Sequence, residues 1–526
     1  MGIYLNPGNE NFTQMSSDEY YVDKTGMLTV LNAFIDKGNK YVCISRPRRF
    51  GKTIAGNMIS AYYSRGCDSS AIFSKLKISS DAGYEEKRNQ FNVIKIDMNS
   101  EYQSAVNKNA LLSRLTMKIK REMSRQFSDV TLYEDDSLAE SILEIYAATG
   151  ETFIIIIDEY DVLAREKADE GLFSEYLSFL NGLFKSDTLR PAITLAYLTG
   201  ILPIVRDKIQ SKLNNFREYT IINSGELAEY IGFTDEEVER LCSDYDVDFT
   251  TCKNWYNGYH QKGWDIYNPE SVVMCIYYGE FDNYWGKTSS YKVISDYISM
   301  DFEGIREDVE RMIAGESVDV NVTGYMNTMT DFDTKDDAFS YLIHVGYLAY
   351  DMKNKTCRIP NFEVLNEWKN AIRIDKKYEV TNRIIKESKE LLTQTLAGNE
   401  QAVAEALDTS HIHVTSNRSY NNEDALASAI YLAYIYALNE YTAIKEVTAG
   451  KGFADVVYIP LEASKTAMVI ELKHNGSAES GIEQIKNKQY FDCLSHYEGD
   501  LLLIGINYDE GTRMHEAKIE KYVKGR

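Results

Sequence analysis

The sequence has little proline, no clustered cysteine and no long apolar run. Only 7 of its 526 residues are proline, and 44% are apolar, a composition that excludes disordered and collagen-like chains. The seven cysteines are scattered, and no two have the spacing of a zinc knuckle, which favours a reducing compartment. The chain starts without a basic and then apolar leader, and its apolar runs are far shorter than the roughly 18 residues of a membrane helix. We therefore expect a cytoplasmic protein with no membrane partner.

Positive charge is also scarce. The chain has 57 basic and 80 acidic residues, which gives a formal net charge of -23 at pH 7. Such a charge opposes strong non-specific attraction to nucleic acid, so any phosphate-binding surface must be local. At about 100 to 200 residues per domain, the length predicts roughly three domains.

The hydrophobic pattern predicts an α/β protein with four successive regions. Over residues 1–225, short apolar runs alternate with amphipathic helical patterns, which is typical of a mostly parallel sheet covered on both faces. Residues 226–300 are rich in Trp and Tyr and predict a small helical lid. Residues 301–394 predict a connector. Residues 395–526 predict an independent α/β unit with a long helix before three short strands.

A degenerate phosphate-binding loop follows the first apolar strand. The usual loop reads G-x-x-x-x-G-K-[ST], in which backbone N–H groups cradle phosphates, Lys reaches the β and γ oxygens, and Ser or Thr holds magnesium. Gly51, Lys52 and Thr53 match this pattern, and Arg46 stands at the first glycine. The alternative is a basic turn before a surface helix.

Two further features extend the predicted nucleotide site. A buried strand ends in Asp158 and Glu159, at the edge where open α/β sheets bind ligands. Asp158 is expected to hold magnesium and Glu159 to polarise the attacking water. Thr199 ends another strand and is a candidate sensor of the γ-phosphate. Arg46 and Arg49, in a basic cluster with Arg48, are candidate contacts to phosphate or to the nucleotide of a neighbouring subunit. The alternatives are ordinary strand-end solvation for the acids, a turn former for Thr199, and a solvated or acid-paired cluster for the arginines.

With these residues the chain resembles the AAA-ATPase-like proteins of bacteria and archaea that carry a C-terminal PD-(D/E)XK nuclease-superfamily domain. The resemblance depends on YYVDKT at 20–25, SRPRRFGKT at 45–53, IIIIDEYD at 154–161, LTGILPI at 198–204, and WYNGY with IYNPESVV within 255–273. Arg46 in place of the first glycine is usual in that family. The resemblance implies ATP with Mg2+ as ligands, and it implies for Lys52, Thr53, Asp158 and Glu159 the roles given above.

A carboxylate-lysine cluster is predicted in the C-terminal unit. Asp455 opens one strand, and Glu471 and Lys473 share a face of the next because side chains alternate along a strand. Asp455 and Glu471 are candidate magnesium ligands, and Lys473 is expected to orient water or offset negative charge. Glu423, with Asp424 as its rival, is a candidate third acid. A solvated strand face is the alternative.

Other polar residues near this cluster divide into two groups. Gln484 and Tyr490 match the glutamine-to-tyrosine pattern of the same family, and the resemblance implies that they support Lys473 or the substrate backbone. Helix packing explains them equally well. His474 points to the other face of its strand, and His411 with His413 lacks a third metal ligand, so none of these histidines is assigned a role.

The sequence therefore predicts a P-loop NTPase parallel sheet with a helical lid, followed by a restriction-endonuclease-like α/β domain. The predicted function is an ATP-dependent, magnesium-dependent nuclease whose partner is nucleic acid, with DNA favoured over RNA. The alternative is an ATPase switch whose C-terminal unit binds nucleic acid or protein without cleaving it. Homo-oligomer formation is left open, and neither Arg206 nor Arg217 can be assigned as an arginine finger.

Overall fold

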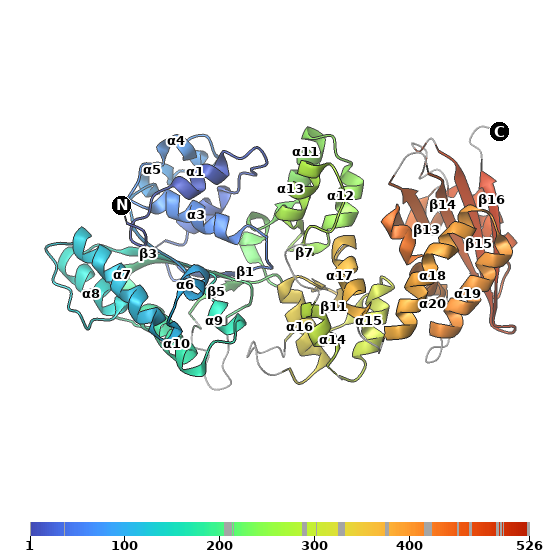
Figure 1. Cartoon of the computed structure of the whole chain (residues 1–526). Helices are drawn as coiled ribbons and strands as arrows, with labels where there is room; N and C mark the ends of the chain where they lie inside the picture. Colours follow the sequence, from blue (N-terminus) through green and yellow to red (C-terminus); the bar gives the residue numbers. More distant parts are fainter. Residues whose placement is uncertain are drawn as a thin grey trace. The chain divides into compact units, whose positions relative to one another are not determined.

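We describe the protein from a computed structural model of the chain (Figure 1). The residues that the structure describes are 2–35, 37–204, 213, 215–286, 292–300, 302–323, 332–373, 378–414, 423–449, 452–461, 465–490, 494, 497 and 499–522. The chain divides into two compact units that interleave along the sequence. Unit 1 contains Met1–Val247, Asn257–Glu280 and Val320–Cys357, and unit 2 contains Asp248–Tyr256, Phe281–Asp319 and Arg358–Arg526.

A parallel five-stranded sheet in the order β2-β3-β4-β1-β5 forms the centre of unit 1. Its strands are β1 (Tyr41–Ser45), β2 (Asn92–Asp97), β3 (Phe153–Asp158), β4 (Ile193–Gly200) and β5 (Arg217–Tyr219). Every residue of β1, β3 and β4 is buried. These strands are continuous apolar runs because helices cover both faces of the sheet. The predicted parallel α/β sheet is confirmed.

Helices lie on both sides of this sheet in Figure 1. On one side are α1 (Glu10–Ser16), α3 (Lys52–Tyr63), α4 (Ser70–Phe73) and α5 (Tyr84–Lys87); on the other are α6 (Met98–Ser104), α7 (Leu111–Gln126), α8 (Leu138–Thr149), α9 (Val162–Arg165) and α10 (Glu170–Phe184). On α7, Leu112, Leu115, Ile119 and Met123 are buried in the core, three or four residues apart, as expected for one face of a helix. The strand order leaves the carboxyl ends of β1 and β3 on either side of β4.

The sheet is followed in unit 1 by a small group of helices and short strands. It includes η4 (Gly225–Tyr230), α11 (Asp235–Asp244), α13 (Pro269–Tyr278) and the sheet β6-β8-β7, with β6 (Phe233–Thr234), β7 (Tyr259–Gln261) and β8 (Trp264–Tyr267). Thr234 and Glu237 form a reciprocal capping box at the start of α11. Unit 1 also contains α2 (Gly26–Asn32), α16 (Lys335–Val345) and β10 (Ala349–Asp351). The domain limits at 225, 300 and 394 stay predictions.

Unit 2 contains helices and a mixed five-stranded sheet in the order β12-β13-β14-β15-β16. Its helices are α12 (Phe249–Tyr256), α14 (Lys292–Ile298), α15 (Ile305–Ile313), α17 (Phe362–Arg373), α18 (Glu379–Leu396), α19 (Glu400–Val414), α20 (Glu423–Ala433) and α21 (Ala478–Lys488). Its strands are β12 (Tyr441–Ala449), β13 (Gly452–Pro460), β14 (Ala467–His474), β15 (Leu501–Asp509) and β16 (Met514–Tyr522). Only β14 and β15 pair in parallel, and α21 connects them.

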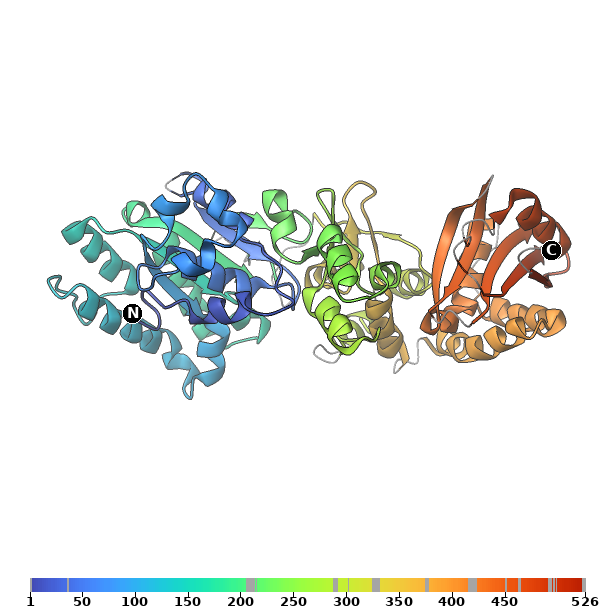
Figure 2. The ribbon, with the colours of Figure 1, turned by 90° about the horizontal axis from the view of Figure 1, so that it is seen from above.

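The two faces of this C-terminal sheet are covered by different helices (Figure 2). On β14, Val469 packs in a core cluster with Ile482 and Ile485 of α21. Glu471 and Lys473 follow Val469 by two and four residues, so they lie on the face that α21 covers.

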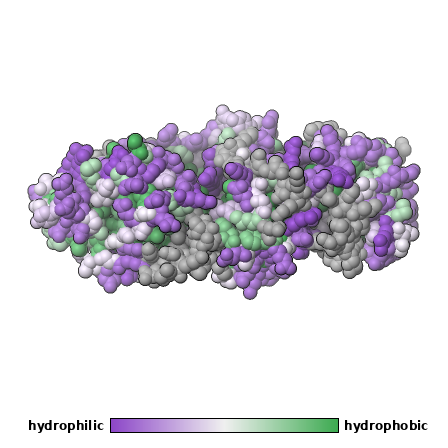
Figure 3. Space-filling view, turned by 60° about the horizontal axis from the view of Figure 1, so that its bottom comes forward, coloured by the Kyte–Doolittle hydropathy of each residue, from purple (hydrophilic) through white to green (hydrophobic). Residues whose placement is uncertain are grey.

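The part of the chain that the structure describes has no helix long and apolar enough to cross a membrane. In Figure 3, the described surface of the visible face is mostly hydrophilic, with smaller apolar areas between the purple ones. Exposed apolar side chains are normal for a folded protein and indicate no membrane contact by themselves.

Candidate functional sites

The loop from β1 to α3 adopts the backbone that its glycine predicts. Gly51 precedes α3 with φ 87°, in the left-handed region that glycine adopts without strain. Arg49 is also left-handed, with φ 71°. At the start of the loop, the Arg46 N–H donates to the carbonyl of Gly200 at 3.1 Å and so ties the loop to the end of β4.

The structure places the Arg46 side chain away from the predicted phosphate position. Its guanidinium is fully buried, and Nη1 donates to the carbonyls of Ser45 and Tyr219 at 2.9 Å each. Burial lowers the pKa of Arg46 to about 9. The side chain thus joins β1 to β5, and the backbone of Arg46, rather than its charge, belongs to the loop.

A cavity of about 830 Å³ lies beside this loop in unit 1. Arg49, Gly51, Lys52 and Thr53 line it together with Glu159. The Lys52 Nζ donates to the carbonyls of Arg46 and Pro47 at 3.0 and 2.8 Å. Burial lowers the pKa of Lys52, and the nearby Glu159 carboxylate opposes that shift. The cavity therefore contains a basic side chain that is held by backbone carbonyls.

The ends of β3 and β4 bring the predicted acids and the predicted sensor together. The Thr199 hydroxyl donates to Asp158 Oδ1, which also accepts the Glu159 N–H at 3.1 Å. Asp158 and Thr199 are buried at the strand ends, whereas Glu159 lines the cavity. Glu159 has φ 53°, an uncommon conformation for a non-glycine residue. This backbone turns the Glu159 side chain away from the path of the strand.

Two functional candidates in this region were not predicted from the sequence, Asp161 and Arg165. Asp161 Oδ2 accepts the N–H groups of Ile201 and Leu202 at 2.9 Å each and lies 3.2 Å from Arg165 Nε. Arg165 Nη2 also donates to Glu159 Oε2. Burial raises the pKa of Glu159, and Arg165 and Lys52 oppose that rise. The sequence signal that could have indicated this pair was its four-residue spacing, which is typical of an ion pair on one face of a helix.

Aromatic and apolar side chains form another part of the cavity lining. Tyr20, Tyr21 and Val22 line it from the N-terminal segment, and Tyr230 and Phe233 line it from the region around β6. Such a lining suits the flat face of a nucleobase, because aromatic rings and apolar groups pack against it.

Ion pairs join segments that are distant in the sequence around this cavity. The Lys24 Nζ donates to the Glu229 carbonyl and to Glu237 of the α11 capping box. Burial lowers the pKa of Lys24, and Glu237 opposes that shift. Arg49 Nη1 lies 3.2 Å from Glu270 Oε1 at the start of α13. The YYVDKT and IYNPES motifs therefore contribute residues to one cavity, a connection that their sequence positions did not reveal.

In unit 2, Asp455, Glu471 and Lys473 lie together on adjacent strands. Asp455 Oδ2 accepts the Leu472 N–H at 2.7 Å, and Lys473 Nζ donates to Glu471 Oε1 at 2.9 Å. Glu471 Oε2 is buried and has no hydrogen-bond partner among the described residues. Burial and the neighbouring Asp455 carboxylate raise the pKa of Glu471 to about 7, against the effect of Lys473. A bound cation would give Oε2 a partner and would offset the negative charge of both carboxylates.

Two glycines let α21 pack closely against the sheet next to this cluster. A Cβ on Gly481 would lie 3.1 Å from the Cα of Gly505 and 3.3 Å from the Glu471 carbonyl. A Cβ on Gly505 would lie 2.0 Å from the Ala478 carbonyl, a distance that no real contact has. The helix therefore packs against the strand backbone only because both side chains are absent.

The end of α21 brings Gln484 and Tyr490 toward the carboxylates. Gln484 Nε2 donates to the Tyr490 hydroxyl at 3.0 Å. Burial raises the pKa of Tyr490, and the negative charges of Glu471 and Asp455 act in the same direction. The glutamine and tyrosine that match the family pattern are thus in contact with each other beside the cluster.

The structure leaves most of the remaining sequence-predicted residues, or their side chains, outside the described part of the chain. Glu423 is the first residue of α20, but its side chain lies outside the described residues, as do those of Asp424, His411 and His413. Arg206 lies outside them altogether, and Arg217 on β5 pairs with Glu226 at 3.1 Å. Within the described part of the chain, no group of three His, Cys, Asp or Glu residues could hold a metal ion.

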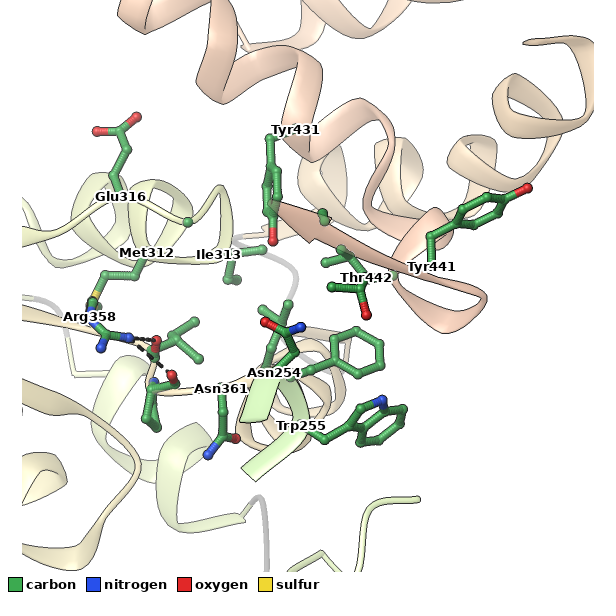
Figure 4. A pocket seen from close by; sticks show the side chains of 17 residues that line it. Asn254, Trp255, Met312, Ile313, Glu316, Arg358, Asn361, Tyr431, Tyr441 and Thr442 are labelled. Atoms are coloured by element: carbon green, nitrogen blue, oxygen red, sulfur yellow. Dashed lines mark hydrogen bonds between the residues drawn. The ribbon is translucent and has the colours of Figure 1, made fainter. Parts of the chain in front are cut away.

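A smaller pocket of about 240 Å³ lies within unit 2 (Figure 4). Trp255 of α12, Tyr431 of α20 and Thr442 of β12 are among its lining residues. Its Arg358 donates to the carbonyls of Ile359 and Pro360 at 3.3 and 3.0 Å. The pocket includes no residue of either predicted catalytic cluster, so we assign it no part in the chemistry.

Comparisons with family models agree with the two sites. Residues 7–210 match the model of predicted AAA-ATPases, and residues 421–518 match that of the PD-(D/E)XK nuclease superfamily. The chain combines an AAA-ATPase-like region with a PD-(D/E)XK nuclease-superfamily region. The first region contains the loop between β1 and α3 and both strand-end acids, and the second contains the carboxylate-lysine cluster. The resemblance inferred from the sequence motifs is confirmed.

Individual relatives are more distant. A protein of Azotobacter chroococcum mcd 1, described as an uncharacterized protein in the vnfD 5' region, is 22% identical over 94% of both chains. Among solved structures, the ORC2 protein of Aeropyrum pernix in ADPNP–ADP complexes has 11% identity and a TM-score of 0.31, over 68% of this chain and 98% of that one. The ORC1 protein of Aeropyrum pernix in complex with DNA has 9% identity and a TM-score of 0.23, over 86% and 93%.

Proposed function

We propose that the protein binds and hydrolyses ATP with Mg2+ in unit 1, and that its C-terminal region is a metal-dependent nuclease that cleaves nucleic-acid phosphodiesters. The AAA-ATPase-like region implies nucleotide binding, and the nuclease-superfamily region implies an enzyme of that class. The specific reactions, residues and metal are the parts that this proposal adds.

The cavity of unit 1 fits a nucleoside triphosphate. Its volume of about 830 Å³ is within the usual range of roughly 300 to 1,000 Å³ for ligand pockets. Its lining combines Lys52 and Arg49 of the loop with aromatic side chains from other segments. In this proposal Lys52 binds the phosphates, Thr53 and Asp158 hold the metal, and Glu159 orients the attacking water. The bound metal would neutralise phosphate charge.

The observation that carries the nuclease proposal is the buried Glu471 carboxylate, which lies next to Asp455 and Lys473. Lys473 contacts its Oε1, and its Oε2 has no hydrogen-bond partner among the described residues. Carboxylate oxygens are the ligands that magnesium prefers, and a bound ion would polarise the scissile phosphate. Lys473 would offset the negative charge that develops as water attacks. Gln484 and Tyr490 would hold the site beside α21.

The proposal is tested with the purified full chain, Mg2+ or Mn2+, and labelled single- and double-stranded DNA and RNA, with and without ATP. We expect metal-dependent cleavage, faster on DNA than on RNA, that Lys473→Ala abolishes. Lys488→Ala, which removes an exposed lysine of α21, is the matched control and should cleave like the wild type. If the wild type cleaves no substrate while ATP turnover is intact, the C-terminal region binds without cutting and the nuclease proposal is wrong.

The cytoplasm is the proposed compartment. The six described cysteines form no disulfide with one another, and five of them are buried: Cys43, Cys242, Cys252, Cys275 and Cys357, with Cys67 partly exposed. Proteins of oxidising compartments more often form disulfides from their cysteines. Mass measurement of the protein from cells, after rapid alkylation, should find these thiols reduced.

A further inference from the structure

Arg165 is a second strong cation at the Glu159 end of the unit 1 cavity. It ends α9, directly after the acidic turn of β3, and it lines the cavity together with Lys52 and Glu159. Its side chain is only 11% exposed. A guanidinium stays charged when it is buried in this way, so its charge must face compensating groups.

Two carboxylates supply part of that compensation. Arg165 Nη2 donates to Glu159 Oε2, and Nε lies 3.2 Å from Asp161 Oδ2. Burial lowers the pKa of Arg165, but Asp161 and Glu159 outweigh it and the net shift is upward. A guanidinium has five N–H donors, and Nη1 makes no hydrogen bond within the described residues. Arg165 therefore retains donors for a ligand of the cavity.

The position of Arg165 relative to Lys52 indicates which part of a ligand it would meet. The two cations lie close enough for the charge of Arg165 to lower the pKa of Lys52, and both oppose the rise in the pKa of Glu159. Tyr21 and Phe233 belong to the aromatic part of the lining instead. In a P-loop the lysine reaches the β and γ oxygens. A cation that lines the same cavity as this lysine and contacts the water-orienting glutamate would therefore lie near the terminal phosphate of a nucleotide bound there.

We propose that Arg165 binds the terminal phosphate of ATP from within the same chain and thereby distinguishes ATP from ADP. This inference rests on the proposed binding of ATP in the cavity. The terminal phosphate competes with Glu159 for the guanidinium, which frees a Glu159 oxygen to accept a hydrogen bond from water. When water attacks the γ-phosphorus and the bond to the β-phosphate oxygen breaks, Glu159 takes the proton, and Arg165 offsets charge on the departing oxygens. The products are ADP and inorganic phosphate.

The first test compares nucleotide affinities by titration calorimetry with Mg2+, using ADP and the non-hydrolysable analogue AMP-PNP on the full chain. Arg165→Gln should weaken AMP-PNP binding about tenfold to a hundredfold and ADP binding less than threefold, because only AMP-PNP has the third phosphate. Arg165→Lys should restore part of the AMP-PNP affinity. The exposed Arg114→Gln is the matched control and should bind both ligands normally.

The outcomes separate the inference from the proposed function. Equal losses of ADP and AMP-PNP affinity would assign Arg165 a structural role through Asp161 and overturn the inference. Unchanged affinities in Arg165→Gln and Arg165→Lys would overturn it too, while ATP binding itself stands. Wild-type protein that binds neither nucleotide would overturn the proposed function and the inference with it.

A mixing experiment tests whether Arg165 acts within its own chain. Arg165→Gln and Lys52→Ala protein are combined, and ATP turnover is measured against each variant alone. No recovery is expected, because neither chain then contains both residues. Recovery to a quarter or more of wild-type turnover would mean that Arg165 reaches the nucleotide of a neighbouring chain, which would overturn the inference.

Discussion

The two candidate sites differ in how their charges are satisfied. In unit 1 three charged side chains that line the cavity have protein partners: Lys52 contacts carbonyls, Glu159 contacts Arg165, and Arg49 contacts Glu270. In the C-terminal region Glu471 has one buried oxygen without a partner beside a second acid. A ligand must therefore exchange contacts in the first site, whereas a cation would complete the second. We expect the first site to discriminate among polyanions and the second to depend on metal.

The largest effect is expected from removing the phosphate-binding lysine of the first site. Lys52→Ala should lower ATP affinity about a thousandfold and abolish turnover, because it removes the loop cation that reaches the β and γ oxygens. Fluorescent-nucleotide titration and phosphate release measure the two effects. Lys37→Ala, at an exposed lysine, is the control, and nucleotide binding equal to wild type in Lys52→Ala would show that the cavity is not the ATP site.

The next effect concerns the metal in the second site. Glu471→Gln should weaken Mn2+ binding to the C-terminal site about a hundredfold, because the amide keeps the shape and loses the charge. Titration calorimetry in an Asp158→Asn background isolates this site from the first, because that change removes a proposed metal ligand there. Glu483→Gln, on the exposed side of α21, should bind Mn2+ normally. Undiminished affinity in Glu471→Gln would remove this carboxylate from the metal site.

We expect the packing of α21 against the sheet at the second site to be sensitive to one added methyl group. Gly505→Ala should destabilise the protein by about 1 to 3 kcal/mol, since its Cβ would lie 2.0 Å from the Ala478 carbonyl. Denaturant unfolding measures this effect. Gly38→Ala, where no atom lies within 4 Å, should change stability little, and equal behaviour of the two variants would contradict the close packing of α21.

The pKa of Glu471, raised to about 7, gives the second site a pH dependence. The folded, metal-free protein favours the protonated acid, so its contribution to stability is full below the unfolded pKa of about 4.3 and is lost as pH rises through 7. Mn2+ favours the ionised acid, and its affinity should rise about tenfold between pH 6 and pH 8. In Glu471→Gln that rise should disappear; a rise of the same size would assign it to another group.

The smallest effect concerns the hydroxyl of Tyr490. Tyr490→Phe removes the hydrogen bond from Gln484 and should reduce the cleavage rate about threefold to tenfold without unfolding the protein. The double variant with Gln484→Ala should be no slower than Gln484→Ala alone, because the two side chains form one contact. Additive losses would mean that they act separately.

Much of the fold was predictable because the decisive signals are local. The isoleucine run of β3 and the alternation over residues 1–225 predicted a parallel sheet, since a strand covered on both faces must be apolar throughout. Period-two alternation placed Glu471 and Lys473 on one face, and their side chains are 2.9 Å apart. The capping box of Thr234 was likewise readable, because its partners are three residues apart.

The residues that sequence reasoning misplaced or missed depend on contacts between distant segments. Arg46 was expected to bind phosphate, but its guanidinium contacts the carbonyl of Tyr219, 173 positions away. Within the YYVDKT motif, Lys24 is paired with Glu237, 213 positions away. No local pattern encodes such pairs, because each depends on which strands and helices become neighbours.

By itself the sequence determined the classes of the two regions, the loop around Gly51 and the composition of both acidic sites, because these depend on residue type and short spacing. Only the tertiary structure decided that Arg46 turns into the core, that Arg165 reaches Glu159, and that Gly481 meets Gly505 behind Glu471. The physical reason is that burial and charge pairing are set by three-dimensional neighbours. The sequence determines the chemical type of each side chain, whereas the packing of the folded chain determines which groups it contacts.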